Sequence, residues 1–359
     1  MNYPRVRRLI NEAITKLNLN LKGYTVYTEA GTGLYAVTPA IAIFAGAEKV
    51  YAISKDTNYG TAAEAFQEVE KIINDTELSR KLVKTFTKDS QHLYEADIVT
   101  NLGHVRPINE DIIKQLNLNK VVIPYMCEAW EQRIGDVDIF KCFKNNIPVM
   151  GTNEEHELIN CFDSCGILAV KLLLEANLEI KGNKIAVYST DKFGRVIYST
   201  LKSLNADVKL FDNIKEIESD KEWLNNLDAL IIADYLEKKQ IVGKNGIINL
   251  RDISVNSPDV VIIPFAGEFD KEYADFFHLH IHPNESLSAI RMSRTLAHLG
   301  PKPTIDLLAG GLKVGQIMRN LKETTNSMEE VINRSANLSG WEGLAQRIKI
   351  SDLKDDFNE

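Results

Sequence analysis

Short apolar runs alternate with stretches of helical periodicity along most of this chain. In the first half the apolar runs fall at residues 24–28, 49–53, 97–101, 121–125 and 149–151. In the second half they fall at residues 184–188, 208–211, 229–233, 260–264 and 278–282. Strands that alternate with helices predict parallel sheets with helices on both faces. We therefore expect an α/β protein of two Rossmann- or flavodoxin-like parallel-sheet lobes with an interdomain cleft.

The break between the two series of strands predicts the domain boundary. The chain has 359 residues, and single domains usually hold about 100–200 residues. We place a substrate-type α/β domain at residues 1–151, with a C-terminal return helix from about residue 304 to residue 335, and a Rossmann-like dinucleotide-binding domain at residues 152–303. One long helix over residues 153–176 is predicted to connect them. Its apolar second half could be buried within one chain or shared across a homodimer.

Charge and composition exclude several classes of function. The net charge is −8 and no basic run is present, so we expect no nucleic-acid partner. No apolar stretch approaches the roughly 20 residues of a membrane-spanning helix, and the start of the chain lacks the apolar core of a signal peptide. The four cysteines have neither disulfide-framework nor zinc-ribbon spacing. These features predict a cytoplasmic protein with reduced thiols that acts on a small molecule.

Residues 183–212 carry the most informative pattern, a strand, a tight turn, a helix and a second strand that ends at Asp212. This is the first half of a dinucleotide-binding unit, in which the turn receives the pyrophosphate. Of the three glycines in the usual G-x-G-x-x-G pattern only the last, Gly194, is present, and Asp191 places a carboxylate near the expected phosphate position. Asp212 would accept from the ribose, which favours NAD over NADP, or would cap the next helix. The candidate cofactor-binding residues are Ser189, Thr190, Asp191, Lys192, Phe193, Gly194, Arg195 and Asp212.

Three loops of the first lobe follow predicted strands, where open α/β sheets bind their ligands. The turn from Glu29 to Gly33 has the glycine freedom of an anion cradle, or is a plain tight turn. The next loop offers a titratable imidazole and a guanidinium that can hold a carboxylate, and the third is dense in polar and aromatic groups. Solvated or salt-bridged surface loops remain the alternative. The candidate substrate-binding residues are Glu29, Gly31, Gly33, Gly103, Arg106, Glu128, Trp130, Glu131 and Arg133, with His104 as a candidate acid/base group.

Three histidines alternate at positions 278, 280 and 282. On a strand they would share one face, but no further ligand pattern completes a metal site, so we expect no metal. His282, at the end of this run, is the leading candidate for an acid/base group, with Glu268 as its carboxylate partner.

Residues 97–313 resemble, in order and spacing, the D-isomer-specific 2-hydroxyacid dehydrogenases, relatives of formate dehydrogenase and more distantly of S-adenosylhomocysteine hydrolase. ADIVTNLGHVRPI looks like the family's substrate loop, whose backbone N–H groups hold a carboxylate, and residues 189–194 match its phosphate loop. SPDVVIIPFAGEFD is similar to the strand that bears the family's catalytic arginine, where this chain has Ala266 or Gly267. The resemblance implies an NAD- or NADP-dependent oxidoreductase that acts on a small, carboxylated substrate.

In that function Arg106 and the Gly103 backbone would orient the substrate, and His282 or His104 would move the proton. Because the arginine is missing, two alternatives stay open. One is a non-redox enzyme, such as a lyase, hydrolase or biosynthetic enzyme, that uses Glu29, Glu128 and Glu131. The other is a catalytically silent ligand-binding protein.

Overall fold

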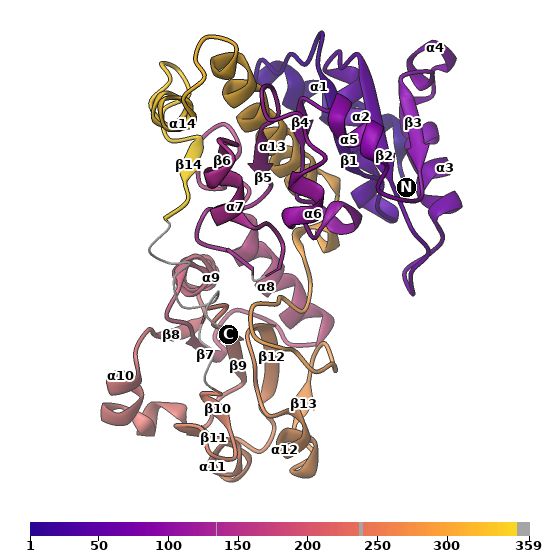
Figure 1. Cartoon of the computed structure of the whole chain (residues 1–359). Coiled ribbons are helices and arrows are strands. Elements are labelled where there is room, and N and C mark those ends of the chain that lie inside the picture. The colour runs from indigo at the N-terminus through magenta and orange to yellow at the C-terminus, as the bar shows by residue number, and fades with distance from the viewer. Residues whose placement is uncertain (134, 237–239, 350–359) are drawn as a thin grey trace. The chain divides into compact units, whose positions relative to one another are not determined.

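The computed structural model describes residues 1–133, 135–236 and 240–349. The chain folds into two compact units. Unit 1 comprises Met1–Cys161 together with Pro301–Glu359, and unit 2 comprises Phe162–Gly300. In the part of the chain described, no helix has both the length and the apolar character needed to cross a bilayer. The elements of each unit are labelled in Figure 1.

Unit 1 is built on one long sheet. Its strands are β1 (Thr25–Glu29), β2 (Lys49–Ile53), β3 (Leu82–Thr85), β4 (Ile98–Val99), β5 (Ile123–Tyr125), β6 (Val149–Thr152) and β14 (Ala345–Arg347). The pairings give the orders β3-β2-β1-β4 and β14-β6-β5, and a parallel bridge between Ile98 and Val122 joins them. Strands 1 to 6 therefore lie in the order 3-2-1-4-5-6, which is the order of dinucleotide-binding Rossmann sheets. Among these described strands, only β14 is antiparallel to its neighbour.

Helices cover this sheet. They are α1 (Tyr3–Lys16), α2 (Val37–Phe44), α3 (Ala62–Ile73), α4 (Thr76–Ser79), α5 (Ser90–Glu95), α6 (Glu110–Ile113), α7 (Ile139–Lys144), α13 (Pro301–Lys322) and α14 (Met328–Ala336), with the 3-10 turns η1 (Gly33–Ala36) and η2 (Gly103–Val105). The start of α3 shows why these boundaries fall where they do. Thr61 and Glu64 form a reciprocal capping box there, and Asn74 ends the helix in the left-handed conformation. Such caps satisfy backbone groups that a helix end leaves unpaired.

Helix α13 returns to unit 1 after the chain has completed unit 2. Its glycines allow close packing, because a Cβ on Gly311 would lie 2.5 Å from Met126 Sδ and one on Gly315 would lie 2.9 Å from Ile98 Cγ2. A larger residue at either position would require the neighbouring side chain or the helix to shift. The stretch predicted as one return helix is divided into α13 and α14, and α13 packs against β4, β5 and β6.

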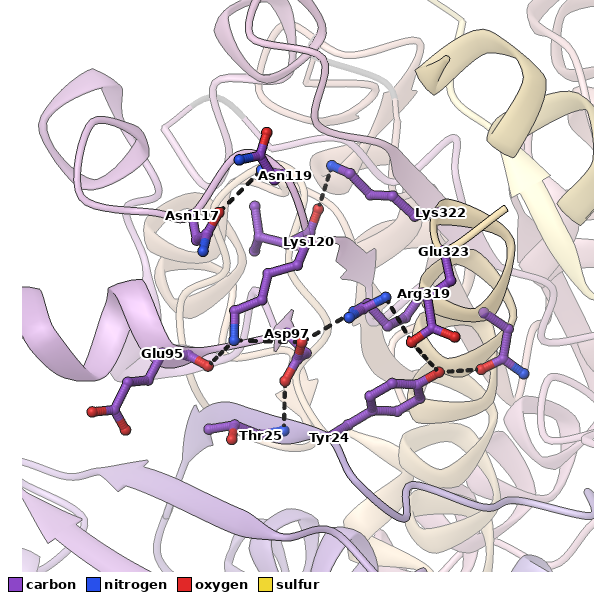
Figure 2. Close-up of polar contacts among 12 residues, drawn as sticks. Tyr24, Thr25, Glu95, Asp97, Asn117, Asn119, Lys120, Arg319, Lys322 and Glu323 are labelled. Carbon is purple, nitrogen blue, oxygen red and sulfur yellow. Dashed lines mark hydrogen bonds and ion pairs between the residues drawn. The ribbon is translucent and has the colours of Figure 1, made fainter. Parts of the chain in front are cut away.

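A cluster of charges ties α13 to the amino-terminal edge of the same sheet (Figure 2). Asp97, which is 5% exposed, accepts a hydrogen bond from Thr25 N at 2.9 Å and one from Arg319 Nε at 3.1 Å. Lys120 Nζ lies 3.5 Å from the same carboxylate, and Lys322 Nζ donates to the carbonyl of Val121 at 2.9 Å. The buried Asp97 thus has cationic partners, as a buried charge requires. These contacts hold α13 against the amino-terminal edge of the sheet, and ligands of such sheets bind at the other, carboxyl-terminal edge.

Unit 2 holds a second parallel sheet. Its strands are β7 (Lys184–Tyr188), β8 (Asp207–Phe211), β9 (Ala229–Ala233), β12 (Val261–Ala266) and β13 (His280–Ile281), beside a small pair, β10 (Val242–Gly243) and β11 (Ile248–Asn249). The order β13-β12-β9-β7-β8 is the flavodoxin-like 2-1-3-4-5. The helices are α8 (Ser164–Glu175), α9 (Lys192–Ser203), α10 (Ile214–Ser219), α11 (Leu250–Asn256) and α12 (Lys271–Phe276), with η3 (Lys221–Leu224) and η4 (Leu296–His298). The predicted α/β class with parallel sheets is confirmed.

Two predicted elements are wrong. The helix expected over residues 153–176 begins only at Ser164, because residues 153–163 form turns in which Asn160 takes a left-handed φ of 41°. The strand expected over residues 278–282 is reduced to His280–Ile281. His278 lies outside it with a φ of 55°, so the three imidazoles do not share the face of one strand.

Candidate functional site

The carboxyl-terminal edge of the unit 1 sheet brings several predicted residues together. The chain runs from β1 outward to β2 and β3 and then crosses to β4 on the other side of β1. Such a reversal of strand order opens a crevice at the strand ends, where α/β proteins bind ligands. Glu29 is the last residue of β1, and Gly103 and His104 begin η2 just after β4. The predicted residues Glu29, Gly103 and His104 therefore flank the switch point of this sheet.

Glu29 and His104 are in contact there. The backbone N–H of His104 donates to Glu29 Oε1 at 3.2 Å, and the imidazole Nε2 lies 3.8 Å from the same oxygen. The Glu29 side chain is 13% exposed, and its burial raises the pKa of the carboxyl, against the opposing effect of the His104 N–H. Burial lowers the pKa of the His104 imidazole, and the nearby Lys55 ammonium lowers it further. The pair thus combines a carboxylate that is easier to protonate than usual with an imidazole that is harder to protonate than usual.

Gly103 makes this contact possible. A Cβ at position 103 would lie 1.9 Å from Glu29 Oε1 and 2.5 Å from Oε2. Because no side chain fits in that space, the carboxylate lies directly against the peptide of η2. The glycine is required here for close approach and not for an unusual backbone angle.

Cations surround the pair. Arg106 donates from Nη1 to Asp136 Oδ2 at 2.7 Å, and the charge of Arg106 acts on Glu29 by lowering its pKa. Lys88 Nζ donates to the carbonyl of Pro107 at 2.9 Å. Burial, and then the charge of Lys55, lower the pKa of Lys88. Arg106 therefore already holds a carboxylate of the protein, and Lys55, whose charge acts on both His104 and Lys88, adds positive charge at this edge.

The loop after β5 has a different role from the one its residues suggest. Glu128 is fully buried and accepts hydrogen bonds from Trp130 Nε1 at 3.0 Å, Gln346 Nε2 at 2.9 Å and the Glu154 N–H at 2.9 Å. With its oxygens engaged by three donors, Glu128 holds the loop and β14 together. Glu131 is 8% exposed and lies 3.7 Å from Arg133 Nη2. We infer a structural role for this group of residues.

The glycine turn after β1 contains a signal that the sequence analysis missed. Gly31, Gly33 and Ala36 form the pattern G-x-G-x-x-A, directly after a strand and leading into η1 and α2. The three-residue extension to Ala36 could have been read from the sequence. Only the strand order, however, shows that this turn belongs to a Rossmann sheet.

In unit 2 the predicted phosphate loop is filled by its own side chains. Asp191 Oδ1 accepts from the Phe193 N–H at 2.9 Å, and its Oδ2 accepts from the Tyr235 N–H at 2.6 Å. Ser189 Oγ accepts from the Gly194 N–H at 3.0 Å, and Asp234 Oδ2 accepts from the Thr190 N–H at 2.9 Å. Burial raises the pKa of Asp191 to about 6, with a further contribution from Asp234.

The donors that a pyrophosphate needs at this turn are therefore already used. Two carboxylates, Asp191 and Asp234, also lie where the phosphate charge would be, which is unfavourable for an anion. Gly194 does keep the close packing expected of it, since a Cβ there would lie 2.5 Å from Ser189 Cβ. Residues 189–194 do not fit a dinucleotide. Asp212 follows β8 and is exposed, and Arg195 is an exposed residue of α9.

The rest of the predicted catalytic group in unit 2 is dispersed. Gly267 has a φ of 89°, and a Cβ there would lie 2.0 Å from the carbonyl oxygen of Asp234, so this position cannot carry an arginine. Glu268 is exposed. The carboxylate beside His282 is Glu175, 3.5 Å from its Nε2, and Glu175 also lies 3.0 Å from His298 Nε2.

Comparison with known proteins identifies the fold. No family sequence model and no curated protein sequence matches the chain. Among solved structures, a dipicolinate synthase polypeptide from Bacillus halodurans superposes with a TM-score of 0.50 at 14% identity, over 84% of this chain and 99% of that one. Its counterpart from Bacillus subtilis superposes with a TM-score of 0.51 at 14% identity, over 86% and 100%. A phosphoglycerate oxidoreductase from Vibrio cholerae O395 matches less well, with a TM-score of 0.42 at 11% identity, over 88% and 99%. At this identity the likeness to dipicolinate synthase shows a shared fold, and it does not carry an activity.

Proposed function

We propose that this protein is an enzyme that moves a proton on a small anionic substrate at the switch point of unit 1, with Glu29 and His104 as the proton-carrying groups. One observation carries the proposal. A carboxylate and an imidazole meet at the strand ends where ligands of such sheets bind, and burial raises the pKa of the carboxyl and lowers that of the imidazole. Both are common groups in general acid–base catalysis.

The roles follow from the geometry. Glu29, buried and with a raised pKa, is a stronger base than an exposed carboxylate. The His104 N–H fixes the orientation of its carboxylate, and the neutral imidazole beside it can accept or return the proton. Lys55, Lys88 and Arg106 supply the positive field that an anionic substrate requires. The reaction class is proton abstraction next to a carboxylate or carbonyl.

Hydrogen exchange provides the test. The full-length protein is incubated in D2O with a panel of small 2-oxo, 2-hydroxy and amino acids, and loss of C–H signal is followed by NMR. We expect exchange of at least one compound, lowered at least about 100-fold in Glu29→Gln. Glu77→Gln is the control, because Glu77 is exposed and pairs only with exposed Arg80. No exchange by the wild type, or equal exchange by Glu29→Gln, contradicts the proposal.

A second candidate is an NAD(P)-dependent oxidoreductase of the 2-hydroxyacid dehydrogenase-like type, a cytoplasmic homodimer in our expectation. The fold shared with dipicolinate synthase and the Rossmann strand order of unit 1 support it. The filled turn at residues 189–194 weighs against its cofactor site in unit 2. A stabilising thermal shift with NAD or NADP is expected if this candidate is right, and no shift with either at saturating concentration rejects it.

A further inference from the structure

The turn after β1 has the local geometry that a phosphate-binding glycine turn needs. In such turns the first glycine permits the tight bend, the second lets a phosphate approach the backbone, and the third small residue permits close packing. A Cβ on Gly31 would lie 2.6 Å from Tyr35 Cβ, whereas Gly33 has a φ of 58° and nothing within 4 Å of its Cβ position. Ala36 is fully buried. The Gly31 N–H already donates to the Tyr35 carbonyl at 3.2 Å, so the open space for a phosphate is the one beside Gly33.

A hollow lies beyond the ends of β2 and β3 of the same sheet. It measures about 560 Å³ and is lined by Ser54, Lys55, Asp56, Thr61, Ala62, Ala63 and Phe86, within the range of small-molecule sites. Phe86 follows β3 and is 60% exposed, with one edge against Phe66. An exposed phenylalanine beside two alanines offers a flat apolar surface for an aromatic base.

The end of β2 is where a Rossmann sheet contacts the adenosine ribose, with an acid for NAD or a basic residue for the extra phosphate of NADP. In this chain β2 is followed by Ser54 and Lys55. Lys55 is exposed, and its charge acts on His104 and Lys88, neither of which is an anion. Asp56 is already engaged, because its Oδ1 accepts from the Ala62 N–H at 2.8 Å. The available group at this strand end is therefore a cation.

We propose that unit 1, and not the turn at residues 189–194, binds a dinucleotide of the NADP type, with its diphosphate at Gly33, its ribose phosphate at Lys55 and its adenine against Phe86. The glycine turn, the hollow and Lys55 all lie at the carboxyl-terminal edge of one sheet. The strand order of that sheet is the one found in dinucleotide-binding folds. The two proposals share Lys55, whose charge also acts on His104. The Glu29 carboxylate on which proton transfer depends is held by the His104 N–H and is not a group of the proposed nucleotide site.

Calorimetric titration of the full-length protein with NADP and NAD tests this inference. We expect one NADP per chain. Lys55→Met should weaken NADP binding by about 10-fold or more, the effect of one charge-assisted hydrogen bond, and should leave NAD binding nearly unchanged. Gly33→Asn should weaken both ligands, because asparagine tolerates the left-handed backbone but its side chain fills the phosphate approach. Arg195→Met, in the alternative loop, should change neither.

Two results overturn the inference. One is that the wild type binds neither dinucleotide. The other is that Arg195→Met weakens binding while Lys55→Met leaves the preference for NADP over NAD unchanged. If circular dichroism shows that Gly33→Asn is unfolded, the ratio of NADP to NAD affinity in Lys55→Met decides. Lys55 is an exposed side chain, so its substitution is expected to leave the fold intact. Hydrogen exchange in the Glu29→Gln variant is read without nucleotide, so failure of either proposal can be told from failure of the other.

Discussion

His104 contacts Glu29 twice, through its backbone N–H at 3.2 Å and through its imidazole Nε2 at 3.8 Å, with both contacts to the same carboxylate oxygen. The two residues are 75 positions apart in sequence and meet because β1 and β4 are neighbours in the sheet. These two contacts hold the Glu29 carboxylate against the start of η2.

The first prediction concerns the glycine that permits this contact. Gly103→Ala should displace the Glu29 carboxylate, because the new Cβ would lie 1.9 Å from Oε1. Overpacking of this kind costs about 1–3 kcal/mol of unfolding free energy. Urea unfolding measures the cost, and the NMR titration of the His104 imidazole reports the displaced carboxylate. An unchanged unfolding free energy together with an unchanged His104 titration would show that the contact is not as described.

The second prediction concerns the cationic field. Since the charge of Lys55 helps to lower the pKa of His104, Lys55→Met should raise that pKa, and NMR titration of the imidazole measures it. Lys144→Met removes the same charge from another exposed position of unit 1 and should leave the titration in place. Equal shifts of the His104 pKa in the two variants would mean that the net charge of the protein, and not the position of Lys55, sets that pKa.

The third prediction concerns the clamp at the opposite edge of the sheet. Asp97→Asn removes the buried negative charge beside the largely buried Arg319 guanidinium, whose other carboxylate partner among the described residues is the more exposed Glu323. We expect a loss of about 2–3 kcal/mol in unfolding free energy. Glu77→Gln breaks an exposed pair with Arg80 and should cost less than about 0.5 kcal/mol. A loss below that level for Asp97→Asn would show that the Asp97 carboxylate does not hold α13 against the sheet.

The fourth prediction concerns pH. The pKa of Asp191 is about 6 in the folded protein, against about 3.9 for an unfolded aspartate. Because the folded pKa is the higher one, the stability contributed by protonated Asp191 is fully present below about pH 3.9 and is lost as pH rises through about 6. The unfolding free energy of the wild type should therefore fall, relative to Asp191→Asn, by up to about 3 kcal/mol between about pH 4 and pH 7. A difference that is flat, or that grows with pH, contradicts the burial of this carboxyl.

The strands were the most predictable part of the fold. The runs at residues 49–53, 184–188 and 229–233 coincide with β2, β7 and β9, because apolar, β-branched segments buried on both faces have few alternatives. Strand β14 could not be found this way. It is short and antiparallel, and its Gln346 pairs with the loop at Glu128, a contact made across most of the sequence.

The candidate site was only half predictable. Glu29, Gly103 and His104 could be named from their places after apolar runs, but their meeting at the switch point of one sheet depends on strand order, which is non-local. The turn at residues 189–194 was predicted to bind a phosphate, and in the structure its own side chains cap the helix. Serine and aspartate at a helix start suit a cap as well as a phosphate loop, and only the contacts to Tyr235 and Gly194 distinguish the two.

The central claim is that proton transfer takes place in unit 1. It is tested most directly by comparing C–H exchange, on the best compound of the panel, in Glu29→Gln and Arg195→Met proteins of equal thermal stability. The account predicts a loss of at least about 100-fold in Glu29→Gln and a rate within about 2-fold of wild type in Arg195→Met, whose exposed side chain lies on α9. Loss of exchange in Arg195→Met with full exchange in Glu29→Gln would place the chemistry at the turn of unit 2 and contradict it.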